Sequence, residues 1–241
     1  MSLVGRLLSK AAAVAFLFGV EPAAAQTKTS TSIFFGADAG PTANAFYLGS
    51  VVAMNGDFSR DGVLVRALGV YGTYNYDAAV GHVQGKYSLF DGMVGYQILR
   101  SGIRVAGYLG AEYQDHRLSP FDPNNPVVGG EAGFKVAGDI TVGHGQPLYM
   151  ILTGSYSTVF DTYWSRLRIG HTVKQVTFGP EGWWSGKENS EEKRVGGFVG
   201  VRVAGTPIEI TGSGGYHFND KGGIFANRDG AYGSLNVGLS F

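Results

Sequence analysis

The sequence contains no cysteine, which excludes disulfide bonds and thiol chemistry. Charged residues are scarce at 16%, and the 19 basic residues equal the 19 acidic ones, so no basic surface for a nucleic acid is indicated. Prolines are few (8), whereas glycine (39), tyrosine (13) and phenylalanine (15) are abundant. Because glycine disfavours helices and aromatic residues favour strands, the composition predicts an all-β protein.

Long hydrophobic runs are also missing after the N-terminal region, so no transmembrane helix is predicted there. The N-terminal region itself has Arg6 and Lys10, then the apolar run Ala11–Val20, and then an alanine triplet. This order is typical of a secretory signal peptide, because the apolar run is too short to cross a bilayer as a helix. We predict that residues 1–25 are a cleaved signal peptide and that 26–241 form one domain. A short N-terminal membrane anchor is the alternative.

The remaining chain consists of short stretches in which apolar and polar residues alternate. The clearest is GIRVAGYLGAEYQ, where Ile103, Val105 and Leu109 fall on one face and Arg104 and Glu112 on the other. A period of two residues predicts a strand with one apolar and one polar face. In a soluble sandwich the apolar face would point inward, whereas in a membrane barrel it would point toward lipid.

Three features favour the membrane barrel. The polar faces mix charges with small residues, which suit a crowded lumen. The predicted strands are about 9 to 13 residues long, as a tilted membrane crossing requires. The last strand, GAYGSLNVGLSF, ends at Phe241 in the manner of outer-membrane barrels. We therefore predict a transmembrane outer-membrane antiparallel up-and-down β-barrel, placed in the bacterial outer membrane after export.

The alternating segments number about twelve, an even number that would put both termini on the periplasmic side. The predicted strands are 32–39, 45–54, 63–74, 86–99, 103–114, 130–142, 148–157, 163–174, 176–184, 194–204, 208–218 and 230–241. Connections on the periplasmic side should be short and those on the extracellular side longer. Two connections depart from this rule, because NGDFSRDG is longer and TVFDT is shorter than expected.

The polar faces would carry charges of both signs into the lumen. The predicted lumen charges are Asp38, Arg66, Asp91, Arg104, Glu112, Glu131, Lys135, Asp139, Arg166, Arg168, Glu181, Arg194, Arg202 and Glu209. Charges in a narrow lumen need partners, so we predict a network of ion pairs across it. Such a network is either a selective polar path or purely structural.

Aromatic residues near the predicted outer ends of the strands suggest an interface belt. This belt would comprise Tyr113, Tyr156, Trp183, Trp184 and Tyr216, which would anchor the barrel at the lipid headgroups. A carbohydrate-stacking platform around the Trp183–Trp184 pair is the competing interpretation.

Asp115, His116 and Ser119 supply the residue types of a hydrolase triad. Neighbours on an extended chain point to opposite sides, however, and no nucleophile-elbow motif accompanies them. Five scattered histidines indicate no dedicated metal site, and the glycine-rich stretches lack the helix that a phosphate loop needs. No catalytic residue, cofactor or metal ligand is therefore predicted.

Several stretches together resemble a known family. They include YLGSVVAMNGDFSRDGVLVRALGVYGTYNYD and FGPEG, and the most specific are YQDHRLSPFDPNNPV and GSYSTVFDTYWSR. From about Phe34 to Phe241 the chain resembles the cellulose biosynthesis protein BcsS family of alphaproteobacteria. The resemblance implies a link to bacterial cellulose production at the cell envelope, and it implies no transferable catalytic residue.

Taken together, these features predict a non-catalytic outer-membrane barrel that assists cellulose synthesis or export. Its partners would be membrane lipid and, by resemblance, a glucan chain and other components of the cellulose machinery. The candidate lumen or glucan contacts are Glu112, Glu131, Trp164, Arg166, Arg168, Glu181 and Trp183. An extracellular loop over residues 115–128 would carry Asp115, His116, Arg117 and Pro120. The alternatives are an outer-membrane enzyme acting on lipid or glycan, and a structural or adhesive barrel.

Overall fold

The computed structural model describes residues 28–187, 190–219 and 229–241. The predicted signal peptide lies outside these residues, as does most of the last predicted extracellular connection. Across the described ranges, no helix is both long and apolar enough to span a membrane.

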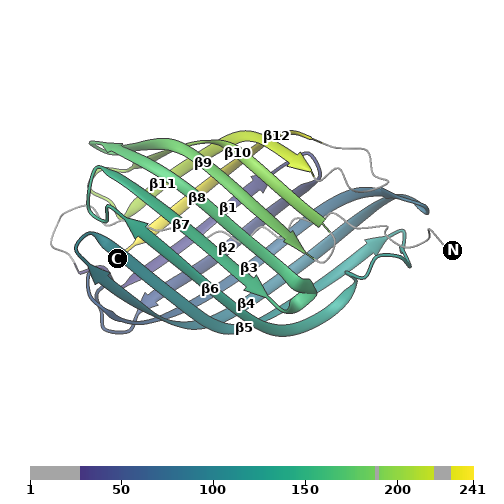
Figure 1. Cartoon of the computed structure of the whole chain (residues 1–241), viewed down its shortest axis with the longest axis horizontal. Helices are drawn as coiled ribbons and strands as arrows, with labels where there is room; N and C mark the ends of the chain where they lie inside the picture. The colour runs from purple at the N-terminus through teal and green to yellow at the C-terminus, as the bar shows by residue number, and fades with distance from the viewer. Residues whose placement is uncertain (1–27, 188–189, 220–228) are drawn as a thin grey trace.

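The described chain forms a closed antiparallel barrel of twelve strands, in which each strand pairs with its neighbours in sequence and β1 pairs with β12. Figure 1 shows the strands winding obliquely around the barrel axis. The elements are β1 (Thr31–Ala39), β2 (Ala43–Ala53), β3 (Gly62–Ala78), β4 (Gly81–Arg100), β5 (Ile103–Ser119), β6 (Gly129–Val142), β7 (Leu148–Ser157), the 3-10 turn η1 (Val159–Asp161), β8 (Thr162–Val173), β9 (Val176–Lys187), β10 (Ser190–Arg202), β11 (Ile208–Asn219) and β12 (Gly230–Ser240). The predicted fold class and strand number are confirmed.

The alternation in the sequence sorts side chains between the lumen and the outside. Phe46, Leu109 and Phe134 lie on the outer wall with 65%, 63% and 74% of their surface exposed, whereas Arg66 and Arg194 on the inner wall are 1% exposed. This distribution, with apolar side chains exposed and charged side chains buried, is the reverse of the one in a soluble β-sandwich. It matches a barrel whose outer surface faces hydrocarbon.

Strands β3, β4 and β5 are longer than predicted, with 17, 20 and 17 residues. The predicted loop over residues 75–85 was wrong, because the β3–β4 ladder continues to the pair Ala78 and Gly81. The first part of the loop predicted over residues 115–128 was also wrong, since residues 115–119 pair with β4. In Figure 1 the β3–β4 hairpin, in blue, reaches furthest toward the right end. One side of the barrel thus extends beyond the rest at the end predicted from the sequence to be extracellular, which we call the extracellular end.

Candidate functional site

The lumen contains a charged cluster on the wall formed by β3 to β6. Lys135 of β6 donates from Nζ to Asp91 Oδ2 over 2.6 Å and also to Glu112. Asp91 in turn lies 3.6 Å from the guanidinium of Arg66. All four side chains are at least nine-tenths buried, so each carboxylate keeps a cation beside it instead of water.

A second cluster lies on the wall formed by β8 to β12. Oε2 of Glu181 accepts hydrogen bonds from Arg166 over 2.5 Å and from Arg168 over 2.9 Å. Oε1 of the same carboxylate accepts from the Tyr232 hydroxyl over 2.9 Å. Both oxygens of Glu181 are therefore engaged, and two of its three donors are arginines, which form charge-assisted hydrogen bonds.

Arg194 connects this wall to β1. Its Nη1 lies 2.8 Å from Asp38 Oδ1, and its Nη2 lies 3.1 Å from Glu192. Because β10 and β1 are separated by two strands, the pair with Asp38 passes through the lumen. His217 lies 3.6 Å from Glu192 and extends the cluster. The predicted ion-pair network is therefore confirmed.

Trp183 lies inside the barrel between two arginines. The guanidinium carbons of Arg166 and Arg194 lie 4.7 and 4.8 Å from its ring centroid. The ring of Trp164 lies 6.1 Å away at 75°. Placing Trp183 in the interface belt was wrong, because Trp183 is 4% exposed whereas Trp184 is 50% exposed on the outside. Consecutive strand residues face opposite sides, so only one of the pair can face lipid.

Trp183 also packs against the opposite wall. It belongs to a hydrophobic cluster whose other buried members come from β1 to β4. These members are Phe34, Ala43, Ala45, Tyr47, Leu68, Val70, Tyr74, Tyr76, Val83, Tyr87 and Leu89. Since β9 lies six strands from β3 in the twelve-strand barrel, this packing spans the lumen. Side chains fill the barrel at this level.

His116 is part of the lumen and not of an extracellular loop. Its Nε2 is hydrogen-bonded to Gln114 over 3.0 Å and its Nδ1 to the Tyr74 hydroxyl over 3.3 Å. Its ring stacks on Tyr87 at 5.5 Å. The sequence contained the signal for this position, because His116 shares the strand parity of Glu112, a residue predicted to face inward.

The other residues of the loop signature lie outside the lumen. Asp115 pairs with Arg117 over 3.0 Å on the outer face of β5, and Ser119 lies on that face at the end of the strand. Pro120 begins the connection to β6. Asp115 and Ser119 are therefore separated from His116 by the barrel wall and cannot form a triad with it. Among the described residues, no three metal-ligating side chains group together.

The extracellular end of the lumen is covered by two connections. Val127 from the β5–β6 connection packs with Val159 and Phe160 of η1. Asp122 accepts a hydrogen bond from the Tyr76 hydroxyl over 3.0 Å, and Asn125 donates to the same hydroxyl over 2.8 Å. We call these two connections, residues 120–128 and 158–161, the extracellular cap.

The β2–β3 turn covers the opposite end, which explains its unexpected length. Phe58 packs against a cluster of inward side chains that includes Leu64 and Tyr108. Gln97 donates to the backbone oxygens of Phe58 and Arg60 over 2.9 and 2.6 Å.

The same turn is held by Asp57. Its carboxylate accepts hydrogen bonds from the Ser59 hydroxyl over 2.6 Å and from the Ser59 backbone N–H over 2.8 Å. These bonds favour the charged form and hold the pKa of Asp57 below its usual value.

Six of the seven candidate residues named from the sequence fall into two groups. Trp164, Arg166, Arg168, Glu181 and Trp183 lie together, and Glu112 belongs to the Lys135 cluster. Glu131 has the inward parity but is exposed at the extracellular end of β6, outside both clusters. Sequence reasoning missed Tyr232, His217 and Phe160, although the strand parity of Asp38 and Arg194 was recognised.

A family model described as cellulose biosynthesis protein BcsS matches residues 32–241. The chain belongs to the BcsS family. Both stretches that carried the resemblance form parts of the extracellular cap or of the strands below it: Tyr113–Val127 contributes Val127, and Gly154–Arg166 contributes Val159 and Phe160. The two stretches on which the resemblance to BcsS rested thus meet in space. No curated protein matches the chain.

Two solved structures share the fold of this BcsS chain at low identity. The beta domain of the Bordetella autotransporter BrkA is 11% identical with a TM-score of 0.53, covering 89% of this chain and 100% of that one. The CymD monoaromatic hydrocarbon channel is 9% identical with a TM-score of 0.51, covering 90% of each chain. These similarities show the barrel fold and nothing about a shared ligand.

Proposed function

We propose that this BcsS family member is a closed, non-catalytic outer-membrane barrel that acts as an accessory component of bacterial cellulose production. The family match supplies the link to cellulose. The observation that carries the closed state is the packing of Trp183 against side chains from the opposite wall. In this function the barrel offers its extracellular surface to the glucan or to another component of the machinery, and its lumen serves as a rigid core.

The charges of the lumen support a structural role over a conduit. A glucan chain is neutral, so its passage would separate Lys135 from Asp91 and Arg194 from Asp38 without replacing the lost charge. Separating a buried pair leaves an uncompensated charge, which costs about 3–5 kcal/mol for each pair. The wall is therefore most stable when it is closed.

The same pairs support a non-catalytic role. Hydrolysis of a glucan uses one carboxylic acid and one carboxylate at a set separation. Glu181 is held between Arg166 and Arg168, and Glu112 is bound to Lys135. Each carboxylate would therefore have to leave its cation before it could approach a glycosidic bond.

Export is part of the proposal. Residues 1–25 would direct the chain through the inner membrane and be removed, leaving Gln26 as the first residue. The intact mass of the barrel purified from outer membranes tests this step, because an uncleaved chain would be heavier by the mass of residues 1–25.

The test of the function is a clean deletion, complemented with the wild-type gene and scored for cellulose and for the location of the other cellulose proteins. We expect less cellulose, or cellulose released from the cell, and restoration by the wild type. Planar-bilayer recordings of the purified barrel should show little conductance, and incubation with lipid or glucan should give no turnover. Normal cellulose in the deletion strain would refute the accessory role, and turnover would refute the non-catalytic one.

A second candidate is a gated conduit in which a glucan contacts the lumen residues Glu112, Glu131, Trp164, Arg166, Arg168, Glu181 and Trp183. The observation in its favour is the buried Nε1 of Trp164, which has no hydrogen-bond partner among the described residues. Indole rings stack on sugar faces, and a free N–H can donate to a hydroxyl. Under this candidate, W164A and R166A lower cellulose output while the barrel still assembles. Wild-type output with normal assembly favours the closed barrel instead.

A further inference from the structure

The outer wall of β2 to β5 changes character in successive cross-strand rows. One row consists of Asn44, Thr73, Lys86 and Arg117, which are direct register partners from strand to strand. The next row toward the periplasm consists of Phe46, Tyr71, Ser88 and Asp115. Outward-facing tyrosines mark the headgroup level of a membrane barrel. The first row therefore lies at or just above the headgroups, on the extracellular side.

Two further rows explain a hollow in the wall below. Leu48, Gly69, Phe90 and Tyr113 form the third row, and the small residues Ser50, Ala67, Gly92 and Ala111 form the fourth. Gly69 has no side chain to fill the space between Leu48 and Phe90. The small residues of the fourth row do not project as far from the sheet as the bulky residues around them. The register thus produces a depression within an otherwise bulky apolar surface.

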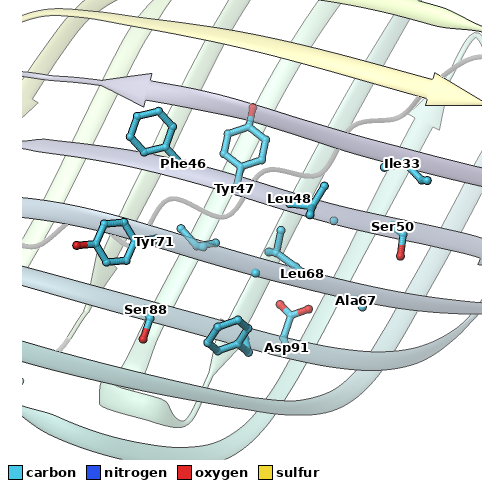
Figure 2. A pocket seen from close by; sticks show the side chains of 14 residues that line it. Ile33, Phe46, Tyr47, Leu48, Ser50, Ala67, Leu68, Tyr71, Ser88 and Asp91 are labelled. Carbon is cyan, nitrogen blue, oxygen red and sulfur yellow. The ribbon is translucent and has the colours of Figure 1, made fainter.

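This depression is an open groove of about 810 Å³. Figure 2 shows Phe46, Leu48 and Tyr71 beside it, with Ser50 and Ala67 toward one end. Its walls are apolar, and Phe46, Leu48, Tyr71 and Phe90 are each at least 53% exposed. A volume of this size is in the range of small-molecule sites. The lining matches a hydrocarbon chain and offers few polar contacts.

A pair of cations lies one row above the groove. Lys86 and Arg117 are directly opposite each other on β4 and β5, where like charges destabilise the sheet. Arg117 pairs with Asp115, but within the described residues Lys86 forms no ion pair. Ser88, which lines the groove, is two residues from Lys86 on the same face of β4. A bound anion between the two cations would remove the repulsion.

We propose that this groove and the Lys86–Arg117 pair form a binding site for an acylated lipid of the outer leaflet whose phosphorylated headgroup carries a net negative charge. The phosphate lies between the two cations, Asn44 and Thr73 supply hydrogen bonds to the headgroup, and one acyl chain occupies the groove over Gly69. The site follows from the lipid-facing outer wall of the barrel and does not depend on the proposed role in cellulose production.

The experiment is native mass spectrometry of the purified full barrel in detergent, titrated with lipid A and separately with phosphatidylcholine. The charge variant is K86Q/R117Q. The groove variant is G69L. A Cβ at Gly69 would lie 3.5 Å from the Phe90 ring, an ordinary contact, and the rest of the leucine side chain would occupy groove volume. The matched control is K193Q, an exposed cation at the same end that pairs with Glu191 over 2.6 Å. Heat-modifiable gel mobility establishes that each variant is folded.

We expect one lipid A to bind tightly to the wild type and to K193Q. Each removed charge should weaken this binding roughly fivefold, so K86Q/R117Q should weaken it roughly 25-fold. G69L should weaken lipid A binding while both cations remain, and excess inorganic phosphate should not displace the lipid. Unchanged affinity in folded K86Q/R117Q, equal affinity for phosphatidylcholine, or displacement by glucan oligosaccharides would each overturn the proposal. If the double variant does not fold, the single variant K86Q tests the proposal, because it should bind lipid A roughly fivefold more weakly than the wild type.

Discussion

The ring of His116 meets the ring of Phe160 edge-on, with centroids 5.2 Å apart and planes at 82°. His116 lies on β5 and Phe160 on η1, so the contact joins a strand of the barrel to the extracellular cap. Each residue comes from one of the two stretches on which the resemblance to the family rested. The contact therefore gives these stretches a common structural role, which is to close the extracellular end of the lumen.

The first prediction concerns Phe160, which closes this end from an unusual backbone conformation. Its φ of 51° lies in the left-handed region, where an aromatic residue is strained. F160A should lower the free energy of unfolding by about 3 kcal/mol through lost packing. F160G should cost about 1 kcal/mol less than F160A, because glycine adopts this conformation without strain. Guanidinium unfolding in detergent, followed by heat-modifiable mobility, measures both.

Phe121 provides the control for this prediction, because it lies in the same cap with 63% of its surface exposed. F121A should leave both the stability and the low conductance unchanged, whereas F160A should also raise conductance. Equal effects of F160A and F121A would show that the cap does not depend on Phe160.

Much of the barrel could be predicted from alternation, because the outer face must be apolar wherever it meets lipid. The signal disappears where strands extend beyond the bilayer. Residues such as Asn75, Asp77 and Gln84 are polar on the outer face there, so this part of the β3–β4 hairpin resembles a loop in the sequence. This part of the hairpin is a strand because β3 and β4 pair with each other there, and the local sequence pattern does not indicate it.

The second prediction concerns the cation at the centre of the β3–β6 cluster. K135M leaves Asp91 and Glu112 buried with one fewer cation, which should cost about 3–5 kcal/mol. Arg202 pairs with Glu209 over 3.5 Å at the periplasmic end, and both are more than a quarter exposed. R202M should therefore cost less than about 1 kcal/mol. Guanidinium unfolding of the two variants compares them, and an equal loss would contradict a buried role for Lys135.

The third prediction separates the two neighbouring tryptophans by their surroundings. A variant that retains only Trp184 (W164F/W183F) should be quenched in vesicles containing brominated lipids, because Trp184 faces outward. A variant that retains only Trp183 (W164F/W184F) should be protected, since its ring lies between Arg166 and Arg194. Strong quenching of Trp183 would show that it faces lipid after all.

The candidate site was less predictable than the fold. Strand parity identifies the inward residues, and Glu181 and Trp183 could be assigned to one face because they are two residues apart. Which inward residues meet depends on the register between strands and on the barrel closure, for example the pair of Arg194 and Asp38 across 156 residues of sequence. Phe160 had no signal at all, because nothing in its neighbourhood indicates a left-handed turn.

The fourth prediction is a pH dependence from Asp57, which lies in the β2–β3 turn outside the membrane-spanning strands. Hydrogen bonds from Ser59 lower its pKa in the folded barrel. In the unfolded chain the pKa is about 3.9. Because the pKa of Asp57 is lower in the folded barrel than in the unfolded chain, the charged carboxylate stabilises the barrel. This stabilisation is complete at a pH above the pKa of the unfolded chain, and it is lost as the pH falls through the pKa of the folded barrel. The difference in unfolding free energy between the wild type and D57N should therefore be constant from pH 7 to about 5 and shrink below pH 4. Guanidinium midpoints of both proteins at each pH measure this difference, in which the titration of all other groups cancels. A difference that stays constant down to pH 2.5 would mean that the charge of Asp57 does not hold the turn.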